Sequence, residues 1–398
     1  MANITIKQIL TSDQNWWRFF EKHKNRIRAA IVICIIKLLS CKNTIRGYQT
    51  YACSNPDCSH TKRVPFTCKS RACSSCGKKA TELWLQKQKN TLPQTAWQHI
   101  TFTMPSELWD FFWCNRSLLN QLSGIAAQCI QKIARKKKIT PGIFTALHTF
   151  GRSLKRNVHV HLSTTTNGIS FDGASWKKLF FHQSTLMKMW RYEIIQLLRQ
   201  AYQNKTLTIP PAIQAQLNHS FTFLNFLNSL YMKHWVVHCA KPSDNYKRNI
   251  EYFVRYTKRP PIALSKLKHY DGNSVTFKYL DHASKRYQTK TLNVEQFIAK
   301  FIQHIPDTGF RLIRYYGFLA NRVRGKLLPK VYQLINQKSQ QKPNPPSYAQ
   351  LIFKNFNFNP LECILCGAPL VLIKTLFGKS NPQQLLPFHR QLATLKNL

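Results

Sequence analysis

The chain has 398 residues, of which 43% are hydrophobic, and this length and composition exclude a disordered polypeptide and suffice for two or three domains. Lysine and arginine total 59 against 15 acidic residues, a formal net charge of +44, which favours a polyanionic partner, and nucleic acid is the obvious one. No apolar stretch approaches the ~20 residues that span a membrane, and the N-terminus lacks a signal-peptide pattern, so we expect a cytosolic protein without a membrane partner.

The first half of the chain is predicted to begin with helices. Apolar residues at helical spacing predict helices over residues 1–40, followed by a cysteine-rich block over 41–80. The alternation of apolar and polar residues from Trp97 predicts a strand that ends at Pro105. The further elements expected in this half are a polar helix over 81–95, helices over 108–136, and a β-hairpin formed by strands 143–150 and 158–165.

The second half is predicted to continue with helices and short strands. The first is a mostly helical stretch over 176–227 with a break at Pro210-Pro211. After it come a strand over 232–239, a short helix over 249–256, strands over 275–280 and 288–292, a helix over 294–302, and a polar linker over 337–347. The expected fold is therefore α+β, with an antiparallel sheet, packed helices and a small zinc module in front. The predicted domains are 1–92 (helical and zinc-binding), 93–330 (catalytic) and 331–398 (linker and tail).

The cysteines favour metal binding, because clustered cysteines in a chain without a secretion signal more often bind metal than form disulfides. Cys53-x4-Cys58 and Cys73-x2-Cys76 are two close pairs that match a structural zinc site, so we predict that these four thiolates bind one Zn²⁺. Cys68, Cys41 and His60 are alternatives that could replace one of these ligands or support a second ion. Cys363-x2-Cys366 is half a site, and the sequence leaves open whether it pairs with the unused N-terminal cysteines, a second chain or nothing.

Two histidines and two tyrosines point to a second kind of site. His159 and His161 alternate in an apolar strand and so share one face, and His148 on the partner strand lies within reach of the same ion. Tyr252 and Tyr256 are one helical turn apart, so both phenols can face one point. Imidazoles that hold a divalent ion opposite tyrosine nucleophiles are suited to cleaving a phosphodiester, although ordinary packing would explain either pair alone.

Basic residues accompany both sites. Arg71 lies in the cysteine block, and Arg255, Lys258 and Arg259 follow or separate the tyrosines. We predict that these four residues contact DNA, and the alternative is a solvated basic face.

These features resemble the two-tyrosine HUH transposases, which are rolling-circle insertion-sequence enzymes with an N-terminal zinc-binding domain. The resemblance runs from about residue 15 to 330. The matching stretches, in the order of the family, are Ser70–Cys76, His99–Pro105, His148–Arg152, His159–His161, Trp235–His238, Tyr252–Pro261 and Tyr316–Arg322.

The resemblance implies a function and assigns roles to residues. It implies an HUH-endonuclease-like sheet, His159 and His161 as ligands of Mg²⁺ or Mn²⁺, and Tyr252 and Tyr256 as nucleophiles that join the 5′ phosphate. His148 is the predicted third ligand, because Ser153 stands where relatives often have an acidic residue. The implied substrate is single-stranded DNA at mobile-element ends in the bacterial cytosol or nucleoid, and a homo-oligomer is one alternative for the assembly.

Two other functions remain open at this stage. A plasmid rolling-circle replication initiator would use the same metal and tyrosines. A non-catalytic, zinc-dependent DNA-binding regulator would use the histidines only structurally. The N-terminal cysteine block and the matches outside the histidines and tyrosines favour the transposase.

Overall fold

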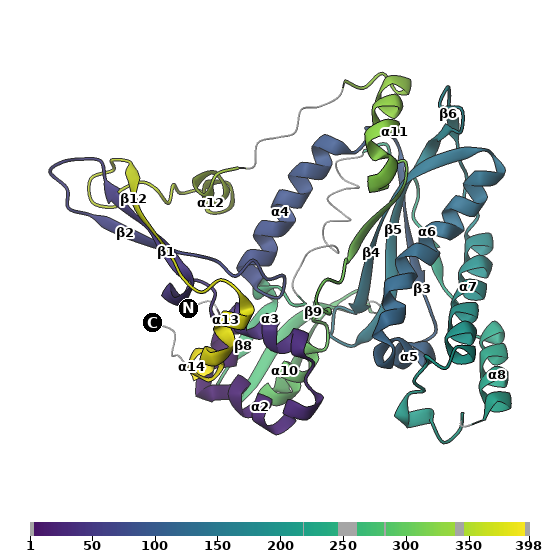
Figure 1. Ribbon diagram of the computed structural model, residues 1–398, viewed down its shortest axis with the longest axis horizontal. Helices are drawn as coiled ribbons and strands as arrows, with labels where there is room; N and C mark the ends of the chain where they lie inside the picture. The colour runs from purple at the N-terminus through teal and green to yellow at the C-terminus, as the bar shows by residue number, and fades with distance from the viewer. Residues whose placement is uncertain (1–3, 218, 246–260, 282–283, 339–345, 395–398) are drawn as a thin grey trace.

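The computed structural model describes residues 4–217, 219–245, 261–281, 284–338 and 346–394. Its largest sheet is antiparallel, and the strand with the two histidines is central (Figure 1). The strands, in spatial order, are β11 (Ile313–Gly317), β4 (Ile139–Phe150), β5 (Arg156–Ser170), β3 (Trp97–Thr103) and β7 (Val237–Cys239), with β6 (Trp176–Lys178) paired to the end of β5. The mixed α+β architecture and the central position of this strand confirm the prediction.

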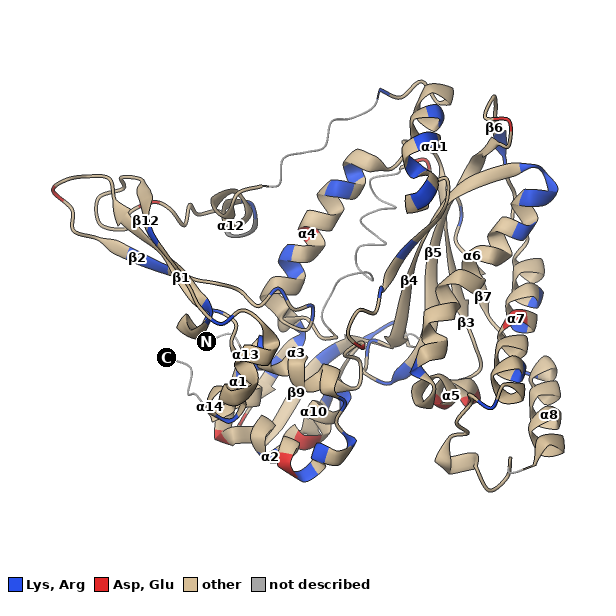
Figure 2. Ribbon diagram, viewed as in Figure 1, with Lys and Arg blue, Asp and Glu red and all other residues tan. Residues whose placement is uncertain are grey.

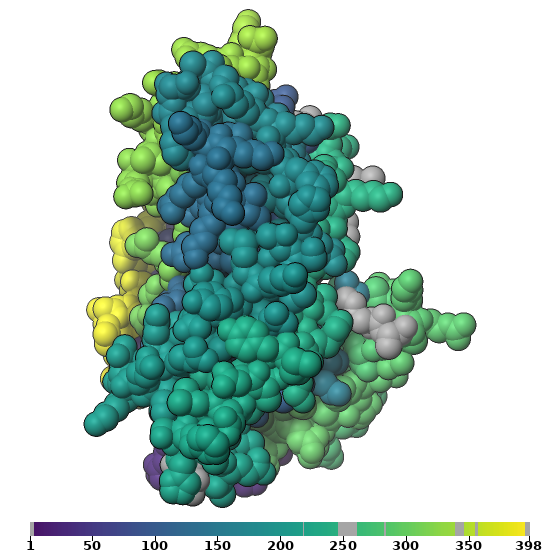
Figure 3. All heavy atoms as spheres, turned by 90° about the vertical axis from the view of Figure 1, so that its right-hand side faces the viewer, coloured from purple at the N-terminus to yellow at the C-terminus, as the bar shows by residue number. Residues whose placement is uncertain are grey.

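Helices cover one face of this sheet. Their bounds are α5 (Trp109–Cys114), α6 (Leu119–Lys136), α7 (Gln183–Gln203) and α8 (Ser220–Ser229). Alternate residues of the central strand, such as Val160 and Leu162, point into the core beneath these helices and are fully buried. In the space-filling view, the segment that contains α7 and α8 occupies much of the outer surface on this side (Figure 3).

The opposite face of the sheet is covered only in part by helices. There α4 (Ser74–Thr91) and α11 (Asn321–Leu334) share a core with Trp97 and Phe144 of the sheet. Lysines and arginines recur along both helices, whereas acidic residues are sparse (Figure 2). The remaining part of this face carries the polar side chains of β3, β4 and β5.

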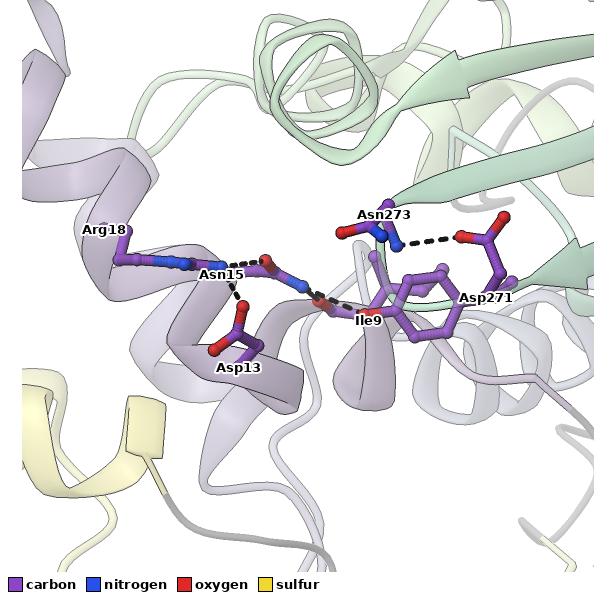
Figure 4. Close-up of polar contacts among 7 residues, drawn as sticks. Ile9, Asp13, Asn15, Arg18, Asp271 and Asn273 are labelled. Atoms are coloured by element: carbon purple, nitrogen blue, oxygen red, sulfur yellow. Dashed lines mark hydrogen bonds and ion pairs between the residues drawn. The ribbon is translucent and has the colours of Figure 1, made fainter.

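The N-terminal helices pack with two segments from later in the chain. One shared core joins α1 (Ile6–Thr11), α2 (Asn15–His23), α3 (Ala29–Leu39), β8 (Leu267–Tyr270), β9 (Ser274–Leu280), β10 (Tyr287–Asn293), α10 (Val294–Ile302), α13 (Pro382–Leu385) and α14 (His389–Thr394). Asn15 links two of these segments, because its Nδ2 donates to the Ile9 carbonyl at 3.0 Å and to the Tyr270 hydroxyl at 2.9 Å (Figure 4). Trp16 Nε1 donates to His389 Nε2 at 2.7 Å and so ties in the C-terminal helix.

Strands β8, β9 and β10 form a second sheet of three strands, and a third sheet, also of three strands, projects as an arm away from these two sheets (Figure 1). It consists of β1 (Gly47–Cys53) between β2 (Thr61–Pro65) and β12 (Leu370–Phe377), and α12 (Tyr348–Phe356) lies beside it. The sequence pattern predicted none of these three strands. The C-terminal segment thus pairs with the cysteine block through β12 and β1. The division of the chain into functional domains at 92 and 330 stays a prediction.

Two further predictions of local structure need correction. The break predicted at Pro210-Pro211 is confirmed, because these prolines start a 3₁₀ turn between α7 and α8. The stretch 176–227 nevertheless begins with strand β6, since Trp176 pairs with Ile169. In the stretch 232–239 only Val237–Cys239 forms a strand. None of the helices among the described residues is long and apolar enough to cross a bilayer.

Candidate active site

The histidine cluster, His148, His159 and His161, lies on the sheet face opposite α6 and α7. Alternation along β5 places His159 and His161 on this face, and His148 is the direct cross-strand partner of His159 on β4. All three side chains are buried, with exposed fractions of 6–9%. The sequence prediction that these three residues share one place is therefore confirmed.

The ring nitrogens of the histidine cluster converge. One ring nitrogen from each of the three residues lies within 4.8 Å of the others, and His159 Nε2 is 3.2 Å from His161 Nε2. His159 Nδ1 is 2.9 Å from the Asn157 carbonyl, which can only accept, so this nitrogen carries the proton and Nε2 presents a lone pair. The cluster therefore forms an HUH-like triad that can hold a divalent cation.

A fourth histidine, to which the sequence assigned no role, supports the cluster. His99 Nε2 lies 3.1 Å from His161 Nδ1, and His99 Nδ1 lies 3.4 Å from Ser163 Oγ. His99 is on β3, where Thr101 rather than His99 pairs with His161, so the contact is diagonal across the two strands. Alternation within β3 places His99 on the same face as Thr101, and the pairing of β3 with β5 puts that face beside His161.

Burial lowers the pKa of two of these imidazoles, His161 and His99. Burial, followed by the charges of His148, His159 and His99, holds the pKa of His161 well below its ordinary value of 6.5. Burial, with a smaller effect from His238, lowers the pKa of His99 to about 4. Neutral imidazole is the form that binds metal, so the site is ready for an ion at physiological pH.

The predicted nucleophiles cannot be placed relative to the histidines. Tyr252 and Tyr256 lie outside the described residues, as do the predicted DNA contacts Arg255, Lys258 and Arg259. Their proximity to the histidine cluster stays a prediction.

The cysteines form two clusters instead of the single one predicted. The inner thiol cluster consists of Cys41, Cys68, Cys73 and Cys76, and the outer thiol cluster consists of Cys53, Cys58, Cys363 and Cys366. The structure thus corrects the predicted grouping, because it separates the pair Cys53/Cys58 from the pair Cys73/Cys76. The pair Cys73/Cys76 is completed by two of the alternative ligands, Cys41 and Cys68, and the pair Cys53/Cys58 by Cys363 and Cys366, for which pairing with N-terminal cysteines was one of the open possibilities.

The inner thiol cluster is buried where α3 meets the start of α4. Cys76 Sγ lies 3.7 Å from Cys41 Sγ and 3.6 Å from Cys68 Sγ, and Cys73 Sγ lies 3.7 Å from Cys41 Sγ. Tetrahedral zinc with Zn–S bonds of about 2.3 Å would separate its sulfurs by about 3.8 Å. The four thiols therefore have the spacing of a structural zinc site.

The predicted DNA contact Arg71 lies between the inner thiol cluster and the histidine-bearing sheet. It lines a cavity of about 450 Å³ together with Lys37, Lys69 and Arg116. Thr149 and Phe150, which follow His148 on β4, line the same cavity. Burial lowers the pKa of Arg71 to about 10, so its guanidinium remains charged at neutral pH. Among its lining residues this cavity has four basic groups and no acidic one, which suits a phosphate chain.

Comparison with known proteins identifies the family. A transposase zinc-binding domain family matches residues 12–104, and a family of putative transposases matches residues 142–326. The chain is 39% identical over 376 residues to the transposase of insertion sequence element IS801 from Pseudomonas savastanoi pv. phaseolicola, covering 94% of this chain and 90% of that protein. It is 29% identical over 305 residues to the putative transposase y4qJ of Sinorhizobium fredii, covering 74% of this chain and 76% of that protein.

The comparison with solved structures found no match. The family matches cover the inner thiol cluster and the histidine cluster, which are the two sites that the geometry assembles. The identity to the IS801 transposase extends over nearly the whole chain. The chain belongs to the IS91/IS801 family of insertion-sequence transposases, DNA-binding proteins with an N-terminal zinc-binding domain and a transposase domain that bears the histidine triad.

Proposed function

We propose that this transposase nicks and rejoins single-stranded DNA at the ends of its mobile element through a 5′-phosphotyrosine intermediate. The observation that supports the proposal best is the buried triad of imidazoles on β5, the central strand, and its neighbour β4. A triad of this kind has no evident structural purpose, because apolar residues would fill the same space at lower cost.

His159, His161 and His148 would hold the catalytic divalent ion, either Mn²⁺ or Mg²⁺. The donor set fits such an ion: cis ligands at about 2.1 Å from an octahedral ion are about 3 Å apart, close to the 3.2 Å between the two Nε2 atoms. Three nitrogens suit a transition metal better than Mg²⁺, which prefers oxygen. When bound, the ion would withdraw charge from the scissile phosphate and orient it.

Tyr252 and Tyr256 are the proposed nucleophiles. The hydroxyl oxygen of one tyrosine loses its proton and attacks phosphorus, and the bond from phosphorus to the 3′ oxygen breaks, which releases a 3′ hydroxyl. The reverse attack by a 3′ hydroxyl rejoins the strand and frees the tyrosine. Two tyrosines allow one strand end to be held while another is cut.

The basic cavity at the end of β4, lined by Thr149 and Phe150, is the proposed entry for the strand. Lys37, Lys69 and Arg71 would neutralise phosphates, whereas Arg116 is already paired with Asp307 at 2.9 Å. Phe150 offers a ring on which a base can stack. Single-stranded DNA is the expected substrate, because the phosphates of a duplex would not reach the histidine side chains, which are only 6–9% exposed.

The inner thiol cluster is proposed to hold structural Zn²⁺ next to this entry. Cys41 follows α3, Cys76 lies in the first turn of α4, and Arg71 lies in the loop between Cys68 and Cys73. The ion would therefore fix the position of Arg71 relative to the sheet.

The test is adduct formation with single-stranded oligonucleotides that carry candidate element ends. The protein is incubated with them and Mn²⁺ or Mg²⁺, and the products are separated by denaturing electrophoresis. We expect a covalent protein–DNA adduct that depends on the metal and maps to Tyr252 or Tyr256. The double variant Tyr252→Phe, Tyr256→Phe should form none, and Tyr192→Phe, whose ring is 52% exposed on α7, should behave as the wild type.

An adduct that persists in the double tyrosine variant would refute the assignment of the nucleophiles. Binding without an adduct under all metal conditions would indicate a DNA-binding regulator. Adducts formed only with a plasmid replication origin, and not with element ends, would indicate a replication initiator.

A further inference from the structure

We propose that the outer thiol cluster binds a second structural zinc ion, which makes the C-terminal segment a part of the N-terminal zinc-binding domain. The family match to the zinc-binding domain ends at residue 104, so it contains only Cys53 and Cys58 of this cluster. The other two thiols come from Cys363 and Cys366, near the opposite end of the chain. The proposal goes beyond the proposed function and requires neither the histidines nor the tyrosines.

The sulfur atoms are spaced for an ion and not for a disulfide. Cys58 Sγ lies 3.7 Å from Cys363 Sγ, Cys53 Sγ lies 3.3 Å from Cys366 Sγ, and all four sulfurs lie within 4.8 Å of one another. Tetrahedral zinc sets this separation at about 3.8 Å, whereas a disulfide needs about 2.05 Å. The spacing matches that of the inner thiol cluster.

The C-terminal pair lies in a tight turn that presents both sulfurs on one side. Gly367 N donates to the Cys363 carbonyl at 2.9 Å, and Cys363 N donates to the Ala368 carbonyl at 2.8 Å. Gly367 has a φ of +74°, a conformation that favours glycine. Backbone N–H groups of Leu365 and Cys366 point at Cys363 Sγ, and that of Ala368 points at Cys366 Sγ. Such N–H donors stabilise thiolates, which are the form that binds zinc.

The N-terminal pair is held in a matching turn. Cys53 N donates to the His60 carbonyl at 2.9 Å, Cys58 N donates to the Asn55 carbonyl at 3.1 Å, and Asn55 N approaches Cys53 Sγ at 3.4 Å. Ser54 N donates to the Pro369 carbonyl at 2.9 Å, so the two turns are joined directly.

His60 adds a contact from outside the four thiols. Its Nδ1 lies 3.1 Å from Cys363 Sγ, a position in which an N–H can donate to a metal-bound sulfur. His60 was one of the alternative zinc ligands expected from the sequence. Because four thiols already complete a tetrahedral site, we assign His60 the role of positioning the Cys363 thiol instead.

The arm has too little apolar burial to hold its three strands together unaided. Its core contains three buried side chains, Tyr51, Cys363 and Leu370. Along β12, Val371, Ile373 and Phe377 are 48%, 59% and 82% exposed. Small sheets with so little core are marginal in water and need a metal or another cross-link. The outer thiol cluster lies where this cross-link is needed, because Cys53 is opposite Leu370 at the outer end of the β1–β12 pairing.

The test counts thiolate–metal bonds in the full-length protein with Co²⁺ in place of zinc. The sulfur-to-cobalt charge-transfer absorption reports thiolates only, so an ion on the histidine cluster does not contribute. We expect two thiolate-bound ions per chain, and half of the absorption in the double variant Cys363→Ser, Cys366→Ser. Cys114→Ser removes an exposed thiol of α5 outside both clusters and should leave the spectrum unchanged.

Hydrogen exchange provides a second measurement that does not depend on metal counting. In the double serine variant the amides of β12 should exchange faster than in the wild type, and the amides of β5 should not change. One thiolate-bound ion per wild-type chain would overturn the proposal, even if the variant failed to fold. A wild-type spectrum retained in the double variant, or a disulfide between Cys363 and Cys366 in the purified protein, would also overturn it.

Discussion

Replacing His99 tests whether the hydrogen bond behind the triad controls metal binding. In neutral His99, Nδ1–H can donate to Ser163 Oγ, which leaves Nε2 to accept from His161 Nδ1–H at 3.1 Å. That bond fixes the tautomer of His161 whose Nε2 lone pair faces His159. In His99→Leu, the proton of His161 loses its nearest acceptor and keeps only the more distant Thr101 Oγ1 at 3.4 Å, so it can move to Nε2, which removes the lone pair from the metal site.

The size of the effect follows from the cost of that lost acceptor. Leaving a buried donor without a partner costs about 1–3 kcal/mol. Removal of a hydrogen-bonding partner behind a metal ligand typically weakens metal affinity by about 10–100-fold, or about 1.4–2.7 kcal/mol. The two ranges agree, so we expect His99→Leu to weaken Mn²⁺ binding by about 10–100-fold.

The assay is titration of Mn²⁺, followed by the loss of the free-ion electron paramagnetic resonance signal, with single-stranded DNA present. His99→Gln is the matched control, because its amide oxygen can accept the same proton, and its Mn²⁺ affinity should stay close to that of the wild type. Equal affinities of wild type and His99→Leu would refute the reasoning. Equal losses in both variants would show that the shape of the imidazole matters and the acceptor does not.

Three further predictions follow from other parts of the fold. Burial lowers the pKa of His389 to about 4, so His389 binds a proton at a higher pH when α14 is released than when it is docked. The docking free energy of α14 should therefore be fully present above about pH 6.5, fall by about 2 kcal/mol at pH 5 and fall further toward pH 4. Amide exchange of α14 measures this free energy. Gly317→Ala should destabilise the protein by about 3 kcal/mol or more in thermal unfolding, because φ is +61° and a Cβ would lie 1.7 Å from the Pro141 carbonyl oxygen. Arg71→Gln should weaken binding of single-stranded DNA and reduce its salt dependence by about one phosphate contact in filter-binding assays.

Each of these predictions has a control within the chain. A Phe at position 389 cannot titrate, so α14 exchange in His389→Phe should not depend on this proton, and an unchanged pH profile would contradict the prediction. Gly325 lies in α11, and a Cβ added there would have nothing within 4 Å, so Gly325→Ala should not destabilise the protein. Lys188→Gln, on the exposed side of α7, should leave DNA binding unchanged, and an equal loss in both variants would assign the effect to net charge.

The histidine cluster was predictable because its determinants are local. Alternation along one strand puts His159 and His161 on one face, and the short loop of the hairpin sets the register that brings His148 opposite His159. The contribution of His99 depends on which strand lies on the other side of β5. The sequence predicted a strand at Trp97 but contained no local signal for its neighbour.

The grouping of the cysteines was not predictable from spacing. Cys53 and Cys73 are close in sequence, but β1 extends from Gly47 to Cys53, and six steps of about 3.3 Å carry Cys53 about 20 Å along the arm. The start of α4 meanwhile keeps Cys73 and Cys76 beside Cys41 at the base. Although the pairs Cys53/Cys58 and Cys73/Cys76 are close in sequence, the extended strand β1 places them far apart in space. The pairing of β12 with β1 brings Cys363 and Cys366 to the other pair. The sequence did not predict β12, because its apolar residues do not alternate with polar ones.

The two thiol clusters differ in how far apart their cysteines lie in the sequence. The inner thiol cluster closes over residues 41–76 and can form as soon as this block is synthesised, whereas the outer thiol cluster needs thiols 305 residues apart for the pair Cys58 and Cys363. Until Cys363 arrives, Cys53 and Cys58 have no partners of their own and can compete for the ion of the inner cluster. The geometry resolves this competition in the finished protein, because the length of β1 keeps the two sets of sulfurs apart. Strand β1 is thus the reason why sequence spacing does not give the grouping of the cysteines. It also keeps Cys53 and Cys58 away from the inner thiol cluster, although both sets of thiols lie in the same short block of the sequence.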